Sequence, residues 1–464
     1  MDASLRNSLN PNKRLKEEFV SNLTGSSMIE IAALSAIIPI LVLLRHSFNS
    51  SGVFDAPLKK SDNPAIRSKS LKRYMAAIAV DFLVIVIPTL LFFTVLAEWS
   101  CSCALLLISL LLLSIATKGI RSHSPLEAAN QTLKANISSY RVVVMFTTCL
   151  CILAVDFRIF PRRYAKTETY GTSLMDLGVG SFVLANSFVS QQARNVPSTK
   201  RKGALKSVFP LIILGFIRLT TTSGVDYQVH VGEYGVHWNF FFTLSAVSIL
   251  STAINIPPQY SGIFGSTILV GYQYWLIYGL NTYLLSNQRE SDIISQNKEG
   301  LFSIFGYWSI YLIGVQLGSS LFFGKKSTAT LWSNRRARII VWMLAFFFWI
   351  ATVLLDSYVE RVSRRMCNLA YVTLVLAQNL QVLAILMLSG CVAGNGTSLL
   401  EEAFNSNLLA AFLLANLLTG LVNLSVDTLS ASSISALFIL LVYAFVLSTA
   451  MGLANFHGIR LKFW

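Results

Sequence analysis

The chain has 464 residues, of which 54% are hydrophobic and only 13% belong to the charged types. Soluble domains contain about 45–50% apolar and about 25% charged residues, so this composition argues against a soluble enzyme and against a disordered chain. The formal net charge of +15 comes mainly from Lys and Arg in short connections between apolar runs. Membrane topology and anionic lipid headgroups explain that placement better than nucleic acid binding does.

Apolar runs that are long enough to cross a bilayer, which takes roughly 20 residues, follow one another along almost the whole chain. They predict helices at 28–45, 74–97, 100–117, 138–155, 171–190, 206–222, 237–253, 262–280, 301–323, 338–355, 367–391, 405–423 and 433–453. The predicted fold is an all-α polytopic membrane protein with about 13 transmembrane helices in one bundle. Residues 28–455 are expected to form this transmembrane domain, between an N-terminal segment at 1–27 and a short tail at 456–464.

Lys and Arg are distributed unequally between the two sides that these helices define. The N-terminus and every second connection carry fewer of them than the connections on the side of the C-terminus. Because cytosolic loops are enriched in Lys and Arg, we expect a lumenal N-terminus and a cytosolic C-terminus. Arg460 and Lys462 also resemble an endoplasmic-reticulum retrieval signal, although basic anchors beside a helix have the same pattern.

The connection at 156–176 breaks this charge rule, because it is rich in cations on the cation-poor side. It also places acids and hydroxyl groups between two apolar helices. Its polar residues include Asp156, Arg158, Arg162, Arg163, Lys166, Thr167, Glu168, Thr169, Tyr170, Thr172, Ser173 and Asp176. Charges in or beside membrane spans are costly, so this density predicts a functional site.

The same connection holds groups that can catalyse a transfer reaction. Asp156 follows an apolar helix, where partial desolvation would make it a usable general base. Lys166 can stabilise an oxyanion or protonate a thiolate leaving group, and Arg162 and Arg163 can bind phosphate through paired hydrogen bonds. The structural alternative is an Asp–Lys ion pair, together with arginines that extend to the headgroup zone.

Other polar positions near the ends of the predicted spans allow two interpretations. Glu30 stands in the first turn of a predicted helix, where a carboxylate also complements the helix dipole. His230 and His237 flank Glu233, which allows a metal cluster, but the Tyr and Trp around them favour an interfacial aromatic belt. We therefore predict no metal site. The sequence also lacks the motifs of ATPases, α/β-hydrolases and dinucleotide-binding folds.

Five segments resemble one known family, in the same order along the chain. They are Lys16–Ile31, Asp156–Ser173, Glu233–Phe241, Ser363–Tyr371 and Asn416–Asn423, and the second is the most specific. On these segments the sequence resembles the inositol acyltransferases of glycosylphosphatidylinositol (GPI) anchor biosynthesis, the PIG-W type, over nearly its whole length. Arg158 and Ala370 depart from the family pattern, in which Pro is common at both positions.

The resemblance implies an activity. Family members transfer a long acyl chain, typically palmitoyl, from acyl-CoA to the inositol 2-hydroxyl of glucosaminyl-phosphatidylinositol in the endoplasmic reticulum membrane. The proposed catalytic pair of the family falls on Asp156 and Lys166, and its described number of spans agrees with the number predicted above. The expected partners are acyl-CoA, the phosphoinositide and the bilayer, with no nucleic acid and no obligate protein partner. No metal or redox cofactor is required.

The candidate substrate contacts are polar residues in or beside the matching segments. They are Asn22, Glu30, Arg162, Arg163, Thr167, Glu168, Thr169, Tyr170, Asp176, His237, Asn239, Arg364, Arg365 and Asn368. The four arginines are candidates for the phosphates of CoA or of the phosphoinositide. On the residues alone, two other classes stay open. One is a lipid or small-molecule transporter, although no inverted repeat is visible, and the other is a non-catalytic membrane scaffold.

Overall fold

The computed structural model describes Leu15 and residues 18–48, 64–118, 126–196, 201–223, 231–323, 331–392 and 398–461, and the structural statements below concern these residues. These ranges are mainly helical, and their only extended pairing is a pair of isolated bridges from Gly25 and Ser26 to Thr172. The predicted all-α fold is therefore confirmed. His230, Lys462 and residues 1–14, 16 and 17 of the N-terminal segment lie outside the described ranges.

The helical elements follow one another as α2 (Met28–Phe48), α3 (Pro64–Asp81), η3 (Phe82–Val86), α4 (Ile87–Phe93), η4 (Ala97–Trp99), α5 (Ser100–Lys118), α6 (Leu126–Ala154), η5 (Arg162–Tyr164), α7 (Leu177–Phe188), α8 (Arg201–Ser223), α9 (Val231–Tyr234), α10 (Phe240–Ile254), α11 (Pro258–Trp275), η6 (Leu276–Leu280), α12 (Asn281–Leu285), α13 (Ile293–Gln296), α14 (Lys298–Phe322), α15 (Leu331–Tyr358), α16 (Leu369–Leu386), η7 (Met387–Cys391), α17 (Leu399–Ser406), α18 (Leu408–Ser425) and α19 (Ser433–Phe456).

Nine helical stretches in the described ranges are long and apolar enough to cross a membrane, so the chain is a multi-pass membrane protein. Each of the predicted spans overlaps one of the observed helices. Four of them fall on α7, α8, α10 and α11, which are not among these nine stretches, and the apolar parts of α7, α8 and α10 are shorter. The total of about 13 crossings therefore stays a prediction.

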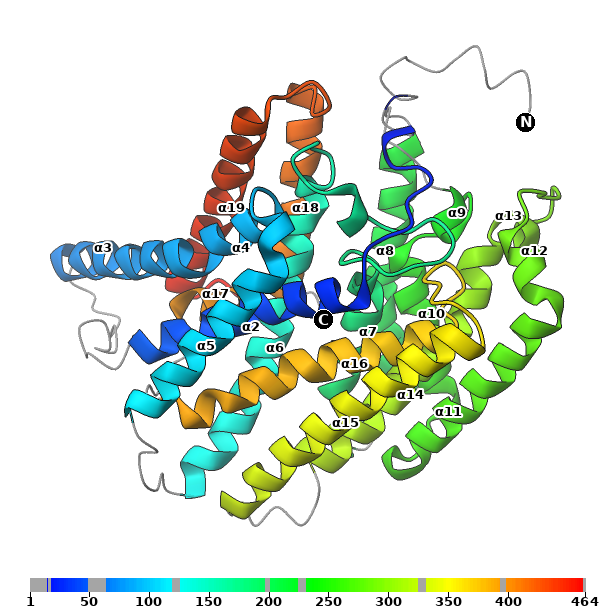
Figure 1. Ribbon diagram of the computed structural model, residues 1–464, viewed down its shortest axis with the longest axis horizontal. Coiled ribbons are helices and arrows are strands. Elements are labelled where there is room, and N and C mark those ends of the chain that lie inside the picture. The colour runs from blue at the N-terminus through cyan, green and yellow to red at the C-terminus, as the bar shows by residue number, and fades with distance from the viewer. Residues whose placement is uncertain are drawn as a thin grey trace.

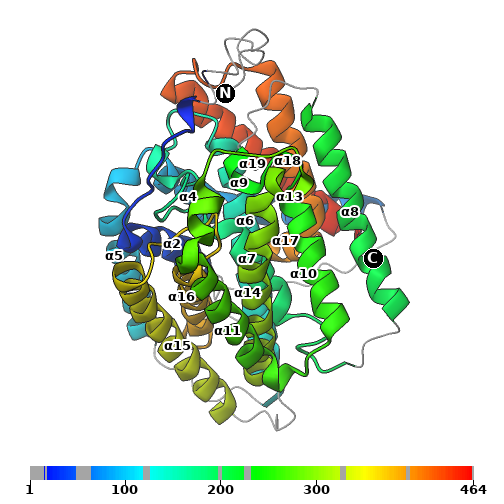
Figure 2. The same ribbon diagram turned by 90° about the vertical axis from the view of Figure 1, so that its right-hand side faces the viewer.

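Helix α16 forms the centre of the molecule. In Figure 1 it crosses the middle of the bundle, and it packs against α2, α6, α7, α14 and α15. Figure 2 shows α7, α10 and α14 side by side, and α14 packs against both of the others. The apolar stretch that contains α16 is 83% buried, whereas those of α5 and α15 are 17% buried. Helices α5 and α15 therefore belong to the perimeter, where a bilayer would cover their apolar side chains.

Two asparagine caps fix the starts of α10 and α16. Oδ1 of Asn239 accepts a hydrogen bond from the backbone N–H of Phe241 at 3.0 Å, and its Nδ2 donates to the carbonyl of Gly215 at 3.0 Å. Oδ1 of Asn368 accepts from the backbone N–H of Tyr371 at 3.1 Å. A side-chain oxygen at this position satisfies a helical N–H that has no partner within the helix. Both asparagines therefore have a structural role that the sequence analysis did not foresee.

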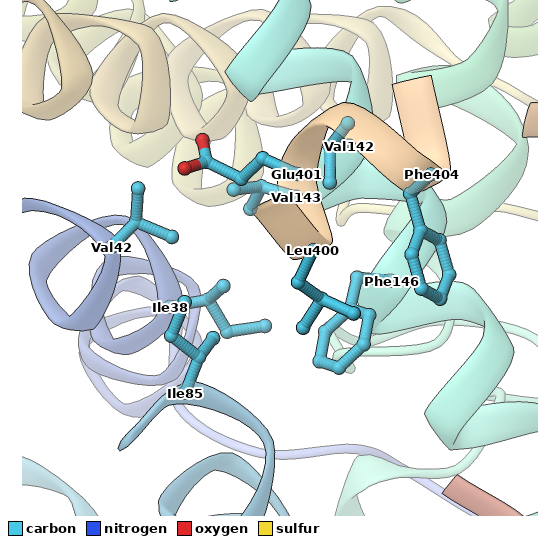
Figure 3. A pocket seen from close by; sticks show the side chains of 9 residues that line it. All are labelled: Ile38, Val42, Ile85, Val142, Val143, Phe146, Leu400, Glu401 and Phe404. Carbon is cyan, nitrogen blue, oxygen red and sulfur yellow. The ribbon is translucent and has the colours of Figure 1, made fainter. Parts of the chain in front are cut away.

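Buried polar pairs join the end of α2 to its neighbours. Nε of Arg45 lies 2.7 Å from Oδ1 of Asp81, and Nε2 of His46 lies 2.7 Å from Oε2 of Glu401 in α17. Polar groups at membrane depth are tolerated when they are paired in this way. A void of about 20 Å³ beside Glu401 is otherwise lined by hydrocarbon side chains from α2, η3, α6 and α17 (Figure 3). It has room for about one water molecule, so it is too small for a substrate.

Gly306 of α14 lies directly against the segment that precedes α16. A Cβ atom at this position would overlap the backbone carbonyl of Cys367, a fully buried residue with a φ of 51°. Because this buried backbone cannot easily give way, we expect Gly306→Ala to lower the free energy of unfolding by about 1–3 kcal/mol. The measurement is the Tm of the detergent-purified protein.

Gly271→Ala in α11 is the matched control for this substitution. No atom lies within 4 Å of a Cβ built there, and Ala is a better helix former than Gly. The Tm of this variant should therefore equal or exceed that of the wild type. Equal Tm values for the two variants would contradict the close packing of α14 on the segment before α16.

Candidate active site

A cavity of about 570 Å³ lies between the connection at 155–176 and the helices that surround it. Ligand pockets typically have volumes of about 300–1,000 Å³. Charged residues in the segments that join the long helices contribute to its wall. We call Asp156, Lys166, Glu233 and Arg364 the charged rim, and Glu233 belongs to the short helix α9. Helices α2, α6, α7, α10, α16 and α18 contribute mostly hydrocarbon. The cavity is therefore suited to a ligand with both a polar and an apolar part.

Arg162 closes the C-terminal end of α6. Its Nη2 atom donates hydrogen bonds to the carbonyls of Val155 at 2.8 Å, Phe157 at 3.2 Å and Phe160 at 3.0 Å. Carbonyls at the end of a helix have no partner within it. Burial lowers the pKa of Arg162 to about 10, so the side chain stays charged at neutral pH. Arg162 therefore shapes the turn that carries Asp156.

Asp156 lies just past the end of α6, in the wall of the cavity. The residue is 4% exposed, and its Oδ2 accepts a hydrogen bond from Nδ2 of Asn423 at 2.7 Å. Asn423 belongs to the last turns of α18, so this contact joins two segments that are 267 residues apart. A hydrogen-bonded carboxylate in this position can take a proton from a hydroxyl group in the cavity.

Lys166 begins a series of ion pairs that leads into the protein. Its Nζ atom lies 2.8 and 2.9 Å from the two carboxylate oxygens of Glu233. The Oε1 atom of Glu233 also accepts from Nη1 of Arg364 at 3.1 Å, and Nε of Arg364 donates to Oδ1 of Asp176 at 3.0 Å. Cations and carboxylates therefore alternate along the series, and each buried charge has a partner of opposite sign.

The two cations of this series differ in exposure. Burial alone would lower the pKa of the Arg364 guanidinium, but the carboxylates of Glu233 and Asp176 outweigh it and raise that pKa above its ordinary value. The Arg364 side chain is only 4% exposed, whereas that of Lys166 is 41% exposed. Arg364 is therefore a fixed anchor, and Lys166 is a cation that a ligand in the cavity can reach.

The segment before α2 crosses the connection at 155–176. Oε2 of Glu168 accepts a hydrogen bond from the backbone N–H of Asn22 at 2.6 Å. Gly25 and Gly171 have φ values of 83° and 129°, and a Cβ atom at either one would overlap backbone of the other segment. Glycine is the residue that tolerates both conditions. This crossing brings Leu23 into the wall of the cavity.

The structure divides the predicted site residues into two groups. Those that line the cavity are Asp156, Lys166, Thr167, Glu168, His237, Asn239 and Arg364. Those that lie outside its lining are Asn22, Glu30, Arg162, Arg163, Thr169, Tyr170, Asp176, Arg365 and Asn368. The two predicted catalytic residues therefore share one cavity with five of the predicted substrate contacts.

Two arginines outside the lining are already paired with carboxylates of the protein. Arg163 lies 3.0 Å from Glu30 and 2.7 Å from Glu98. Arg365 lies 2.8 Å from Glu299, whose side chain is fully buried. These contacts give both arginines partners within the protein, and their assignment to substrate phosphates stays a prediction.

Several polar residues of the cavity wall were absent from the predicted substrate contacts, among them Arg218, Glu233, Ser35, Gln378 and Asn379. Glu233 entered the sequence analysis only as a possible metal ligand, yet it pairs with Lys166. Ser35, Gln378 and Asn379 also line the cavity, although they lie within apolar helices. Polar residues inside membrane spans are often functional, and this signal would have identified all three.

Comparison with known proteins identifies the family to which this chain belongs. Residues 12–454 match the GWT1 protein family. An uncharacterised protein of Arabidopsis thaliana is 57% identical over 433 residues, which cover 92% of this chain and 98% of that protein. The phosphatidylinositol-glycan biosynthesis class W protein of Dictyostelium discoideum is 34% identical, and the GPI-anchored wall transfer protein 1 of Gibberella zeae is 35% identical. Each of these two matches covers 97% of this chain and 98% of the relative. The family resemblance seen in the sequence is thus confirmed, and this chain belongs to the GWT1 family.

Proposed function

We propose that this protein is an O-acyltransferase of GPI-anchor biosynthesis. It transfers a long acyl chain, typically palmitoyl, from acyl-CoA to the inositol 2-hydroxyl of glucosaminyl-phosphatidylinositol. It does so in the endoplasmic reticulum membrane, with a lumenal N-terminus and a cytosolic C-terminus. The names of the Dictyostelium and Gibberella relatives support the pathway. The observation that carries the proposal is that Asp156 and Lys166 line one cavity, together with mostly hydrocarbon from the surrounding helices.

In this reaction Asp156 acts as the general base. Its carboxylate takes the proton from the inositol hydroxyl, and the resulting oxygen nucleophile forms a bond to the thioester carbonyl carbon. The carbon–sulfur bond then breaks, and the electron pair goes to the sulfur of CoA. The hydrogen bond from Asn423 to Oδ2 of Asp156 orients the carboxylate towards the acceptor. No covalent acyl-enzyme is needed, because both substrates meet in the same cavity.

Lys166 supplies positive charge to the tetrahedral intermediate and a proton to the leaving group. Its ammonium group stabilises the oxyanion and then protonates the departing thiolate. The contacts of 2.8 and 2.9 Å with Glu233 hold Nζ in place. Arg364 in turn holds Glu233 at 3.1 Å. The buried arginine therefore acts on the chemistry through Glu233 and Lys166, as a positioning residue.

The first test replaces the base. We expect Asp156→Asn to reduce transfer of labelled palmitoyl from palmitoyl-CoA to glucosaminyl-phosphatidylinositol by about 10²–10⁴-fold. The amide keeps an oxygen that can accept from Asn423, so the Tm of the variant should stay close to that of the wild type. Asp427→Asn is the control, because Asp427 lies just past α18 and outside the lining of the cavity.

Either of two results would overturn this assignment. Full activity in Asp156→Asn would show that Asp156 is not the general base. If a well-folded wild type transfers no acyl chain, the proposed function itself is wrong. In the second case, movement of the unmodified lipid between leaflets would return a transporter to consideration.

The second test distinguishes the contribution of Lys166 from that of its partner Glu233. Lys166→Met removes the cation and should lower kcat by about 10²–10³-fold. Glu233→Gln leaves the cation in place but loosens it, so we expect a smaller loss of kcat, of roughly tenfold, with little change in KM. Glu98→Gln is the matched control, because Glu98 pairs with Arg163 and its side chain is 76% exposed. Wild-type kcat in Glu233→Gln would contradict the positioning role of Glu233.

A further inference from the structure

The cavity continues far along α6, beyond the charged rim. The lining residues of α6 and its end recur at each helical turn, at Val144, Thr148, Ile152 and Val155. Val143 also lines the cavity, whereas Tyr140, one turn further on, does not and is fully buried. At about 1.5 Å per residue, the stretch from Val143 to Val155 is about 18 Å long. The cavity is therefore long enough for an extended chain.

Hydrogen-bonded polar side chains lie at the inner end of this stretch, where the lining on α6 stops. The Tyr140 hydroxyl donates to Oδ1 of Asn379 at 2.8 Å, and Oγ of Ser35 donates to Oε1 of Gln378 at 2.5 Å. We call Ser35, Tyr140, Gln378 and Asn379 the polar floor. The buried Nε2 atom of Gln378 has no hydrogen-bond partner among the residues that the structure describes. The floor comes from three helices that meet in the core of the molecule: α2, α6 and α16.

We propose that the polar floor is a ruler that sets the length of the transferred acyl chain. This inference rests on the acyl transfer proposed above. A hydrocarbon chain advances about 1.3 Å per carbon, because C–C bonds of about 1.5 Å follow a zigzag. A groove of about 18 Å therefore accommodates about 14 carbons beyond the reacting carbonyl. The ruler favours chains close to palmitoyl in length.

The chemistry of the floor explains why longer chains are disfavoured. Each methylene group that enters the hydrocarbon part of the groove gains from burial. A methylene group that extends past Val143 would instead lie against the amides of Gln378 and Asn379. The Nε2 donor of Gln378 is already enclosed by the protein, so a longer chain gains no burial there. To extend further it must break the hydrogen bonds Ser35–Gln378 and Tyr140–Asn379, which would leave buried polar groups unpaired. Shorter chains lose burial, and longer chains meet this polar surface.

The first arm of the test shortens the groove in steps. Val144→Phe fills the groove close to the floor, and Thr148→Phe fills it one helical turn nearer to Asp156. We expect Val144→Phe to lower kcat/KM for palmitoyl-CoA by about tenfold or more, while lauroyl-CoA remains a good substrate. Thr148→Phe should shift the preference further, towards octanoyl-CoA, since one helical turn of about 5.4 Å matches about four carbons.

The second arm removes the polarity of the floor. Gln378→Leu should raise kcat/KM for stearoyl- and arachidoyl-CoA relative to palmitoyl-CoA by about tenfold. Gln381→Leu is the matched control on the same helix. The side chain of Gln381 accepts from Trp349 at 2.9 Å and donates to the carbonyl of Ala32 at 3.0 Å, and it does not line the cavity. The Gln381→Leu variant should keep the wild-type profile of chain lengths.

The outcomes distinguish this inference from the proposed function. Both arms use the purified full-length protein, a series of acyl-CoA chain lengths and a fixed lipid acceptor. If active variants of both arms keep the wild-type profile, the ruler is wrong and the acyltransferase stands. If the variants change the preference for the tails of the phosphoinositide instead, the groove holds the acceptor, and the ruler is again wrong. If the wild type transfers no chain of any length, the proposed function fails and the ruler fails with it.

Discussion

Arg364 is buried between the carboxylates of Glu233 and Asp176, and this interaction joins three segments that are far apart in the sequence. An unpaired charge at such a site is very costly, so the positions of all three groups depend on one another. Asp176 precedes α7, Glu233 lies in α9, and Arg364 lies shortly before α16. The ion pairs therefore hold together the ends of several helices around one cavity, and they bring Lys166 to its edge.

The cavity satisfies two requirements that usually conflict. A long acyl chain needs a water-free groove, whereas proton transfer and a departing thiolate need charged groups close by. In this fold the long helices supply most of the groove, and the segments that join them supply most of the charges, with Arg218 of α8 as an exception. The division follows from the membrane itself, because backbone at membrane depth must be helical and charges are tolerated best at its borders. A reaction between two amphiphilic substrates is suited to that boundary.

The helices could be predicted from the sequence, and so could the concentration of charge at 156–176, part of which lines the cavity. The length of an apolar run can be read from a short stretch of sequence. The same is true of a connection that carries many cations on the side where the other connections carry few. The partners of Lys166 and Asp156 could not be predicted in this way. Glu233 is 67 residues from Lys166, and Asn423 is 267 residues from Asp156. Such pairs are formed by the packing of helices, and residue type gives no information on which helix ends meet.

The arginines also show that residue type alone does not determine the partner of a side chain. Arg162, Arg163 and Arg365 were predicted to contact phosphate, because guanidinium groups bind phosphate well. The same groups bind carboxylates and helix-terminal carbonyls equally well, and these are the partners that the structure gives them. Only the arrangement of the neighbouring segments decides between the two kinds of partner. Conversely, Gln378 and Ser35 carry no motif, and their meaning comes from their place in the groove.

In the proposed reaction, one cavity holds the thioester at its charged rim and the acyl chain between α6 and α16. The most direct measurement is a cryo-EM map of the purified protein with a ketone analogue of palmitoyl-CoA, in which a methylene group separates the sulfur from the carbonyl carbon, so that the acyl chain cannot be transferred. We predict that the analogue places its carbonyl oxygen within hydrogen-bond distance of Lys166 and its chain along Val155, Thr148 and Val144. A well-ordered analogue bound elsewhere, for example on the perimeter at α15, would contradict this account.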